Sequence, residues 1–416
     1  MDTHTDIVVV GAGLAGLSAA ATAAAGGARV VVLEAHRSGG RARTTARRGF
    51  VWNLGAHALY LGGPGAAVLA SLGVTPRGAP PPLGRYLGSR GGGLHRLPTG
   101  PASLLRSGLL GTRSKAQLAA VLARLPRLSP DDFEGISTRR WIDDQGLRPD
   151  AVAVVLALLR LGTYCADPDA LGADAAVAQM QLAAASGVRY LDGGWAQLTD
   201  ALAAGVEVRT TAPVRSIEPA AGRFELVGDD GRVVARQVVI AVGGPAATRQ
   251  LLPDPPDWGD LGAPVTAACL DLGVSRPPEP GYVLGIDTPY YATTQGPPAR
   301  QAPPGGAVVG VLRYGARSAA EDREELDAHR RLAGVADDDI VVERFLASMT
   351  VASTAPRPER GGLRGRPGTD ATGTPGIHLA GDWVGPDGLL ADAALASGAA
   401  AARQALSGLD RTGRVP

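Results

Sequence analysis

The chain has 416 residues, of which 45% are hydrophobic and 19% are charged. Such a composition supplies a large core for two or three domains and excludes a disordered chain. Only two cysteines occur, Cys165 and Cys269, which excludes a disulfide framework and leaves no ligand cluster for zinc or iron–sulfur binding. We therefore expect no metal site.

The charge is distributed unevenly, although the formal net charge is only +1. Residues 35–130 carry 13 Arg and one Lys without any Asp or Glu, a charge of +14, so the rest of the chain carries −13 (1 − 14). The asymmetry marks an anion-binding face or is cancelled when the acidic parts fold against the basic part, and cancellation is the simpler interpretation. No recognition motif accompanies the charge, so we expect no nucleic-acid partner.

The sequence shows no signal for secretion or for a membrane span. The chain enters an apolar strand by Ile7 without a signal-peptide pattern, and the longest apolar runs, such as 151–161, are too short for a bilayer. We expect a cytoplasmic protein. Residues 104–128 mix apolar residues with Arg and Lys, which favours a helical cover on a substrate domain and leaves a peripheral membrane contact open. The sequence does not indicate an oligomeric state.

Residues 6–34 are predicted to form one βαβ unit. An apolar strand at 6–10 leads into an alanine-rich helix at 14–25, which Gly26-Gly27 ends before a second apolar strand at 29–33. Short apolar strands on either side of a helix predict parallel pairing with a right-handed crossover.

The rest of the chain alternates between helical and strand-rich stretches, and it shows no internal repeat. Residues 76–101 are a Pro- and Gly-rich connection. We predict helices at 103–128, 151–161, 321–332 and 392–406. We predict strands at 206–209, 214–218, 223–227, 233–235, 237–241 and 376–380, with a turn at 229–231 and further strands within 263–314.

The first chemical signal is the glycine pattern Gly11-Ala-Gly13-Leu-Ala-Gly16, which follows a strand and opens a helix. Gly11 permits the tight turn, Gly13 lets a diphosphate approach the backbone, and Gly16 lets the helix pack closely on the strand. The free N–H groups of the helix N-terminus favour an anion. Glu34 ends the next strand, where its carboxylate can accept hydrogen bonds from ribose hydroxyls. Together these features predict a dinucleotide site.

The first glycine pattern fits both NAD and FAD, and a second glycine pattern distinguishes between them. The stretch Gly39-Gly40-Arg41-Ala42-Arg43 resembles the superfamily of flavin amine oxidases, phytoene desaturases and protoporphyrinogen oxidases. In that superfamily a Gly-Gly-Arg motif follows the βαβ unit, and its Arg reaches the FAD. The resemblance assigns this role to Arg41, whose guanidinium suits a phosphate. The alternative is that Arg41 and Arg43 are solvated loop charges.

Three further stretches resemble the same superfamily in the same order. Residues 51–57, Val-Trp-Asn-Leu-Gly-Ala-His, are similar to its Asp-x-Gly-Ala-His segment beside the flavin, with Asn53 in place of Asp. Residues 193–242 resemble its second set of FAD-domain strands. Residues 379–398, which begin Leu-Ala-Gly-Asp, resemble its C-terminal FAD motif.

The resemblance implies FAD as the cofactor and assigns roles along its length. The backbone of Val214 would contact adenine, Asp382 would bond the ribityl or phosphate region, and Leu390 with Ala391 would lie near the flavin pyrimidine. The full set of expected cofactor contacts is Gly11, Gly13, Leu14, Ala15, Gly16, Glu34, Ala35, Gly40, Arg41, Ala42, Arg43, Gly55, Ala56, His57, Val214, Ala241, Val242, Gly381, Asp382, Leu390 and Ala391.

The order of these motifs implies an α/β fold with a discontinuous domain organisation. We expect a Rossmann-like FAD-binding domain of the glutathione-reductase type, together with a discontinuous α+β substrate domain. The expected FAD-binding domain consists of residues 1–82, 186–250 and 355–416. The expected substrate domain consists of residues 83–185 and 251–354.

A flavin carries the redox chemistry itself, so few catalytic residues are needed. His57 is the only histidine on a flavin motif, and it and Tyr60 are the catalytic candidates, with a structural role as the alternative. Cys165 is interpreted as a buried small residue rather than a nucleophile. The aromatic candidates for the substrate pocket are Tyr164, Tyr290, Tyr291 and Trp383.

Two departures from the superfamily argue against a typical amine oxidase. Amine oxidases commonly use a Lys in the later half of the chain, whereas the single Lys here is Lys115. They also often place a Tyr before the last helix, where this chain has Leu390. A less aromatic pocket weakens recognition of an amine.

The sequence therefore predicts two-electron oxidation, by dehydrogenation or desaturation, of a small organic metabolite, in the setting of a biosynthetic pathway. The electrons would pass to oxygen, a quinone or another acceptor. Three alternatives stay open: a flavin-dependent isomerase or cyclase without net oxidation, an amine oxidase, and a non-catalytic escort protein on the same scaffold.

Overall fold

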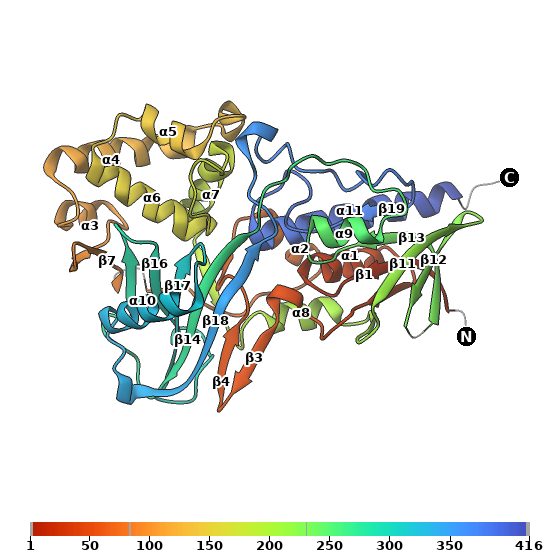
Figure 1. Ribbon diagram of the computed structural model, residues 1–416, viewed down its shortest axis with the longest axis horizontal. Coiled ribbons are helices and arrows are strands. Elements are labelled where there is room, and N and C mark those ends of the chain that lie inside the picture. The colour runs from red at the N-terminus through yellow and green to blue at the C-terminus, as the bar shows by residue number, and fades with distance from the viewer. Residues whose placement is uncertain (1–2, 83–84, 230, 413–416) are drawn as a thin grey trace.

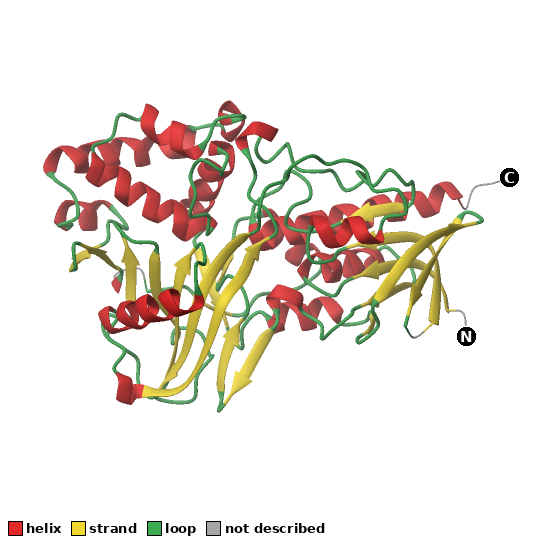
Figure 2. Ribbon diagram, viewed as in Figure 1, coloured by secondary structure: helices red, strands yellow, loops and turns green. Residues whose placement is uncertain are grey.

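The computed structural model describes residues 3–82, 85–229 and 231–412. The molecule is elongated, with one lobe that contains both ends of the described chain and a second lobe built around a largely antiparallel sheet (Figure 1). Helices gather above the second sheet and along the first one (Figure 2). The chain passes between the lobes several times, so both lobes are assembled from separated segments.

The first sheet has parallel strands at its centre and an antiparallel meander at one end. Its strands, in spatial order, are β10 (Glu207–Arg209), β2 (Val30–Leu33), β1 (Thr3–Val10), β13 (Gly231–Ile240), β12 (Arg223–Gly228) and β11 (Val214–Ala220), and β19 (Ile377–Leu379) also pairs with β13. β1 runs parallel to both β2 and β13. The long β13 pairs with β12 along its first half and with β19 along its second half. The C-terminal strand therefore joins the sheet that the N-terminus begins.

Helices from both ends of the chain pack together against this sheet. They are α1 (Leu14–Ala25), α2 (Pro64–Ser71), α8 (Ala196–Ala203), α9 (Pro245–Leu251) and α11 (Leu390–Thr412). α1 and α11 pack closely at Gly398, where a Cβ would lie 2.1 Å from the Ala15 carbonyl oxygen and only glycine leaves room. Ser18 Oγ donates a hydrogen bond to the Leu395 carbonyl at 2.8 Å. This close packing brings the first and last motifs of the sequence to the same edge of the sheet.

The second lobe is a seven-stranded sheet covered on both faces. Its strands, in spatial order, are β18 (Ile340–Ala352), β14 (Val265–Val274), β17 (Ala307–Tyr314), β16 (Tyr290–Gly296), β15 (Tyr282–Gly285), β7 (Leu87–Arg90) and β8 (Gly93–Arg96). All neighbours are antiparallel except β15 and β7. α10 (Ala319–Leu332) covers one face. The helices on the other side are α3 (Pro101–Arg106), α4 (Thr112–Arg124), α5 (Thr138–Asp144), α6 (Pro149–Thr163) and α7 (Ala173–Ser186).

Short strands connect the two lobes. β9 (Val188–Leu191) pairs with β5 (Ala58–Tyr60) and β6 (Gly78–Ala79), and β3 (Thr44–Arg47) forms a hairpin with β4 (Phe50–Asn53). Arg344 of β18 holds this hairpin by donating to the Asn53 carbonyl at 2.6 Å and to Asp271 Oδ2 at 2.6 Å. Its guanidinium also lies 5.5 Å from the ring centre of Trp52.

The expected α/β fold with a second domain is confirmed, and α1 has the bounds that the sequence predicts. The predicted helix at 103–128 is wrong in its continuity, because residues 107–111 between α3 and α4 contain Gly108 and Gly111 and leave the helical conformation. The two predicted strands at 233–241 are one strand, β13. The predicted turn at 229–231 includes residue 230, which lies outside the described residues. The domain boundaries stay a prediction.

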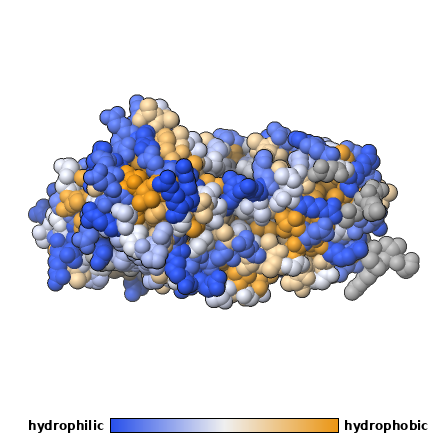
Figure 3. All heavy atoms as spheres, turned by 90° about the horizontal axis from the view of Figure 1, so that it is seen from below, coloured by the Kyte–Doolittle hydropathy of each residue, from blue (hydrophilic) through white to orange (hydrophobic). Residues whose placement is uncertain are grey.

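The surface carries scattered apolar side chains. Figure 3 shows a largely hydrophilic face on which hydrophobic side chains gather in separate patches. The most exposed large hydrophobic residue of the described chain is Leu105, at 74%. Single exposed apolar residues are ordinary on protein surfaces, so the membrane contact stays a prediction. In the described chain, no helix combines the length and the apolarity that crossing a bilayer requires.

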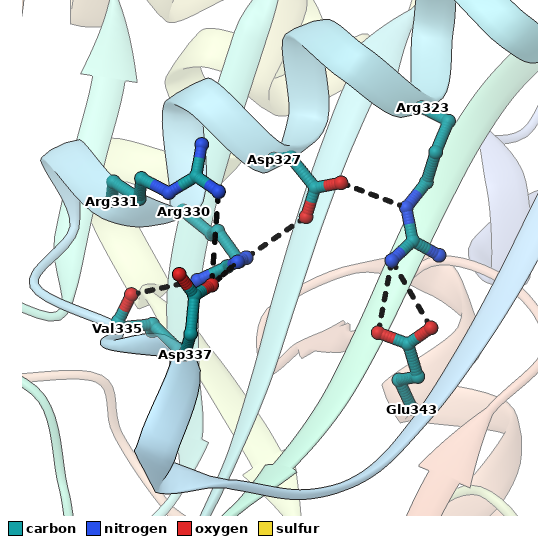
Figure 4. Close-up of polar contacts among 7 residues, drawn as sticks. All are labelled: Arg323, Asp327, Arg330, Arg331, Val335, Asp337 and Glu343. Carbon is teal, nitrogen blue, oxygen red and sulfur yellow. Dashed lines mark hydrogen bonds and ion pairs between the residues drawn. The ribbon is translucent and has the colours of Figure 1, made fainter.

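An ion-pair network fixes α10 and the turn that follows it to the edge of the second sheet (Figure 4). Arg330, whose side chain is 4% exposed, donates to Asp327 Oδ1 at 2.9 Å and to the Val335 carbonyl at 3.0 Å, and it also pairs with Asp337. Arg323 links Asp327 to Glu343 of β18 in the same network. The buried guanidinium therefore closes the turn after the helix.

Replacing Arg330 by Met is expected to lower the free energy of unfolding by about 1–2 kcal/mol. The variant loses the bond to the Val335 carbonyl, while Asp337 at 67% exposure can be solvated, which limits the cost. Urea unfolding of the purified protein measures the change. Arg331→Met is the matched control, because Arg331 is 59% exposed and its nearest Asp337 contact is 3.7 Å. Equal destabilisation by both variants would contradict the assignment.

Candidate functional site

Three glycines shape the turn between β1 and α1, and each does so for a different reason. Gly11 has φ +104°, a left-handed conformation, and a Cβ there would lie 2.5 Å from the Ala241 carbonyl oxygen. A Cβ at Gly16 would lie 1.8 Å from the Gly11 carbonyl oxygen. At Gly13 no atom lies within 4 Å of the Cβ position. The turn is therefore tight at both ends and open in the middle, where α1 begins without a side-chain cap.

The carboxylate of Glu34 lies at the end of β2, beside this turn. Glu34 Oε2 accepts a hydrogen bond from the Ala12 N–H at 2.7 Å, and Oε1 accepts one from the His36 N–H at 2.8 Å. These backbone bonds hold the carboxylate against the cavity that it lines. The role of Glu34 as an acceptor of hydrogen bonds from a ribose stays a prediction.

The second glycine pattern packs directly on the first. The Gly39 N–H donates to the Ala12 carbonyl at 2.7 Å, and a Cβ at Gly40 would lie 3.2 Å from Gly13 Cα. Both Gly39 (φ +108°) and Gly40 (φ +51°) adopt the left-handed conformation that favours glycine. The two loops together place Arg41 at the cavity.

Arg41 forms a two-pronged ion pair with Asp382, which comes from the other end of the chain. Arg41 Nη1 donates to Asp382 Oδ2 and Arg41 Nη2 donates to Oδ1, both at 2.7 Å. The Ser353 N–H also donates to Asp382 Oδ2 at 2.9 Å. Burial works to raise the pKa of Asp382, but the charge and hydrogen bonds of Arg41 and Ser353 outweigh it and hold that pKa below its usual range. The carboxylate is thus ionised and fully engaged.

A second arginine, Arg366, fixes the backbone around Asp382. It is buried and donates to the Asp382 carbonyl at 3.0 Å and to the Gly388 carbonyl at 2.9 Å. Burial is the main reason that its pKa falls to about 10, although Asp382, Asp387 and Asp174 oppose the fall. Arg366 therefore stays a cation at neutral pH and ties the turn 382–388 together.

These groups surround one cavity of about 520 Å³, a volume typical of a site for a cofactor or a drug-sized ligand. Most of the expected cofactor contacts line it. They are Gly11, Gly13, Leu14, Ala15, Glu34, Ala35, Gly40, Arg41, Ala42, Gly55, Ala56, Val214, Ala241, Val242, Gly381, Asp382, Leu390 and Ala391. Gly16, Arg43 and His57 do not line it, and Gly16 acts beneath the turn, through packing.

The structure adds lining residues that the sequence analysis missed. They are Val10, Leu33, His36, Trp195, Gly243, Leu251, Val351 and Ala394. Trp195 stands out because its indole N–H donates to the Ala56 carbonyl at 2.7 Å and its backbone N–H donates to Asn53 Oδ1 at 3.0 Å. The Gly193-Gly194 signal preceding Trp195 could have pointed to it. Val351 is contributed by the second lobe and carries no motif.

Neither catalytic candidate is among the residues that line the cavity. The His57 ring is 3% exposed, and neither ring nitrogen has a hydrogen-bond partner among the described residues. Burial is the main reason that its pKa is lowered. Tyr60 Oη donates to the Gly162 carbonyl at 3.3 Å, and burial is the main reason that its pKa rises to about 12. Their catalytic role stays a prediction.

The aromatic candidates for the substrate pocket scatter over both lobes. Trp383 is buried against Trp258, with ring centres 5.0 Å apart. Tyr290 packs on His329 of α10 at 5.6 Å, on the sheet face opposite the large helical layer. Tyr291 Oη lies 3.3 Å from Tyr190 Oη. None of these three, nor Tyr164, is among the residues that line the cavity.

A second, much smaller cavity adjoins the first. Its volume is about 10 Å³, which is room for about one water molecule. It shares Leu390 and Asp382 with the large cavity, and Thr163, Cys165, Val265 and Thr354 are among its other neighbours. Leu390 has φ +54° at the start of α11, an uncommon left-handed conformation for leucine. Leu390 therefore forms the wall between the two spaces.

Asp392 follows this wall and joins α11 to α2. Its Oδ1 accepts a hydrogen bond from the Gly65 N–H at 2.9 Å, and a Cβ at Gly63 would lie 2.4 Å from its Oδ2. Burial raises the pKa of Asp392 to about 6, and the bond from Gly65 only partly opposes this. Folding thus raises the pKa of this carboxyl group at the start of the last helix and so favours its neutral form.

Replacing Arg41 by Met is expected to lower the free energy of unfolding by about 2–3 kcal/mol at neutral pH. Asp382, 2% exposed, would lose the cation that compensates its burial, although the 38% exposure of Arg41 to the cavity limits the effect. The difference from wild type should shrink in acid, because the stabilisation by the ion pair is lost as the pH falls through the lowered pKa of Asp382 and the carboxyl is protonated. Urea unfolding between pH 3 and 8 measures it. Exposed Arg47→Met is the control, and an equal loss there would refute the assignment.

Replacing Asp392 by Asn is expected to remove a pH dependence of stability. Because folding raises the pKa of Asp392 from 3.8 to about 6, the wild type should lose up to about 3 kcal/mol relative to the variant as the pH rises from 4 to 7. Thermal unfolding across this range gives the difference. Asp387→Asn, on the exposed turn before the helix, should follow the wild type. Parallel curves for wild type and Asp392→Asn would show that the carboxyl does not titrate as described.

A known protein family matches most of this chain. The family model described as flavin containing amine oxidoreductase matches residues 14–275, more than half of the chain. No curated protein matches the sequence significantly.

Solved structures share the fold at low sequence identity. Putrescine oxidase bound to putrescine aligns with a TM-score of 0.74 and 18% identity, covering 100% of both chains. An oxidoreductase from Methanosarcina mazei aligns with a TM-score of 0.71 and 20% identity, over 95% of this chain and 99% of that one. Cyclohexylamine oxidase from Brevibacterium oxydans IH-35A aligns with a TM-score of 0.70 and 17% identity, over 99% of this chain and 100% of that one. The chain therefore belongs to the family of flavin containing amine oxidoreductases and is an FAD-dependent oxidoreductase.

Proposed function

We propose that this enzyme oxidises a small, uncharged and largely apolar metabolite by dehydrogenation, and that it does not recognise an amine. The proposal rests on one observation. Among the described residues, Asp382 is the only carboxylate that lines the small cavity at Leu390, and both of its oxygens are bonded to Arg41. A substrate ammonium would therefore find no free carboxylate there.

The residues around the large cavity fit FAD. The open position at Gly13 and the uncapped start of α1 suit a diphosphate, because backbone N–H groups and the helix dipole favour an anion. Glu34 faces the cavity where a ribose would lie. We assign to FAD those expected contact residues that line the cavity. When bound, FAD accepts the two electrons of the oxidation.

The chain's own residues would bind and shield the substrate rather than exchange protons with it. The small cavity has room for about one water molecule, so a substrate would bind where Leu390 divides it from the large cavity. Around this point lie Cys165, Val265 and Leu389, with Thr163 and Thr354 as neutral hydrogen-bonding groups. Apolar walls exclude water and favour an apolar substrate. The single Lys115 lies on α4 and donates to the Leu105 carbonyl at 2.8 Å, away from both cavities. A cytoplasmic location and a role in biosynthesis complete the proposal.

A matched pair of ring compounds tests the substrate class. Under anaerobic conditions, the FAD-loaded enzyme is mixed with cyclohexylamine, with putrescine, and with neutral ring ketones and alcohols of the same size. Bleaching of the flavin absorption measures electron transfer. We expect reduction by a neutral compound at a rate at least tenfold above that by either amine, because an ammonium must be buried without a counter-charge.

Faster bleaching by either amine would overturn the proposed substrate class while leaving the family assignment intact. Turnover of a neutral substrate to a product of the same oxidation state, without bleaching, would overturn net oxidation and favour isomerisation.

A further inference from the structure

Three side chains that commonly bind metals meet beneath the segment that lines the cavity. Cys269 and Asp271 lie two residues apart on β14, so they face the same side of the sheet. His57 reaches them from the loop between β4 and β5. One ligand atom from each of the three lies within 4.8 Å of the others, and all three side chains are buried.

The His57 ring is the unexplained member of this group. It is 3% exposed, yet neither of its nitrogens has a hydrogen-bond partner among the described residues. Buried polar groups almost always have partners, so a buried imidazole without one suggests a missing ligand.

A fourth polar group lies beside the imidazole. Gln295 of β16 is 1% exposed, and both atoms of its amide lack partners in the described chain. The Cβ position of Gly310 is 2.7 Å from Gln295 Nε2 and 3.1 Å from His57 Nε2, so the two side chains converge over a residue without a side chain. Rotation of the amide by half a turn exchanges its oxygen and nitrogen, which presents an oxygen to the group.

Asp271 is already oriented for such a role. Its Oδ2 accepts from Arg344 Nε at 3.0 Å and Nη2 at 2.6 Å, while its Oδ1 faces Cys269, whose Sγ donates at 3.3 Å. Carboxylates that bind metals are typically held by such outer hydrogen bonds. The charge of Arg344 also limits the negative charge that a thiolate and a carboxylate would otherwise place in the core.

We propose that His57, Cys269 and Asp271, with Gln295 as the fourth ligand, bind one divalent cation of the zinc class. Nitrogen, thiolate and oxygen donors in a set of four suit Zn²⁺ better than Ca²⁺ or Mg²⁺, which prefer oxygen alone. Bonds of about 2.0–2.3 Å place tetrahedral ligands about 3.5 Å apart, so the side chains need to close by about 1 Å. Binding replaces the thiol proton of Cys269, which leaves to solvent as the sulfur–metal bond forms.

The site would be structural and separate from the FAD cavity. Gly55 and Ala56 line that cavity, whereas the side chain of His57 points into the second sheet, at Gly310. A cation there would fasten the segment 55–57 to β14. From the low cysteine count, the sequence predicts no metal site. The sequence alone does not show that the fold brings His57 to Cys269.

Metal content of the intact protein tests the site. Because the group is buried, the protein is produced in medium supplemented with Zn²⁺ or with Co²⁺, and metal per chain is measured by mass spectrometry alongside flavin per chain. We expect about one equivalent of metal, and the Co²⁺ protein should show the intense visible bands of a tetrahedral site with a thiolate ligand. Folded, flavin-loaded wild-type protein without stoichiometric metal would overturn the proposal, and this outcome depends on no variant.

The two cysteines supply a matched pair of variants. Cys269→Ser should lose the thiolate band and at least about tenfold in metal affinity, whereas Cys165→Ser should keep both, since Cys165 lies at the small cavity and outside the group. Equal metal content and equal spectra in the two variants would place the metal elsewhere and also refute the proposal. Flavin content serves as the readout for folding in each case.

Discussion

The ion pair between Arg41 and Asp382 holds the two ends of the chain together at the cavity. Arg41 follows the first βαβ unit, and Asp382 follows β19, which reaches the same sheet from the other end of the sequence. The pair also involves the second lobe, because Arg41 Nη1 donates to the Val351 carbonyl at 3.1 Å and Asp382 accepts from the Ser353 N–H. Three separated segments thus depend on one buried charge pair, so none of them can shift without exposing or isolating a charge.

The glycines make this convergence possible. Side chains at Gly11, Gly16 or Gly40 would push apart the loops that carry the free N–H groups of α1 and the guanidinium of Arg41. Gly398 has the same effect between α1 and α11. The cavity therefore depends on close backbone contacts between segments that are distant in sequence, and the ion pair stabilises the arrangement those contacts allow.

The parts of the site that the sequence predicted are those with strong local rules. A helix that starts after a glycine turn and ends at Gly26-Gly27 is determined within a dozen residues, and the bounds of α1 were found correctly. The placement of Glu34 at the end of β2 follows in the same way. Long-range features were predicted less well. The partner of Arg41 is a carboxylate rather than a phosphate alone, and Val351 enters the cavity from a strand with no motif.

Side-chain direction was the main thing that the sequence could not predict. The sequence predicts the Gly55-Ala56-His57 stretch beside the flavin. Gly55 and Ala56 line the cavity, but successive side chains point in different directions, so the His57 ring turns toward Cys269. Trp383 and Tyr290 were likewise chosen for their aromatic character, and both pack into cores whose partners, Trp258 and His329, lie far away in sequence.

The charge partners of the basic stretch 35–130 could not be predicted from the sequence either. Within the described residues Arg41 alone of its cations pairs with a carboxylate, so the acidic parts do not cancel it by direct ion pairs.

This pattern separates what the family shares from what distinguishes this enzyme. The features that the glycine motifs share across such folds are backbone geometry and helix polarity, both of which local sequence rules can describe. In the proposed function, the substrate is selected by the neutral walls at Leu390 and Thr354 and by the engaged state of Asp382, which arise only when the two lobes meet. Two proteins can therefore keep the same glycine patterns and yet differ in substrate, because these walls come from segments outside the patterns. Family membership alone does not imply an amine substrate here.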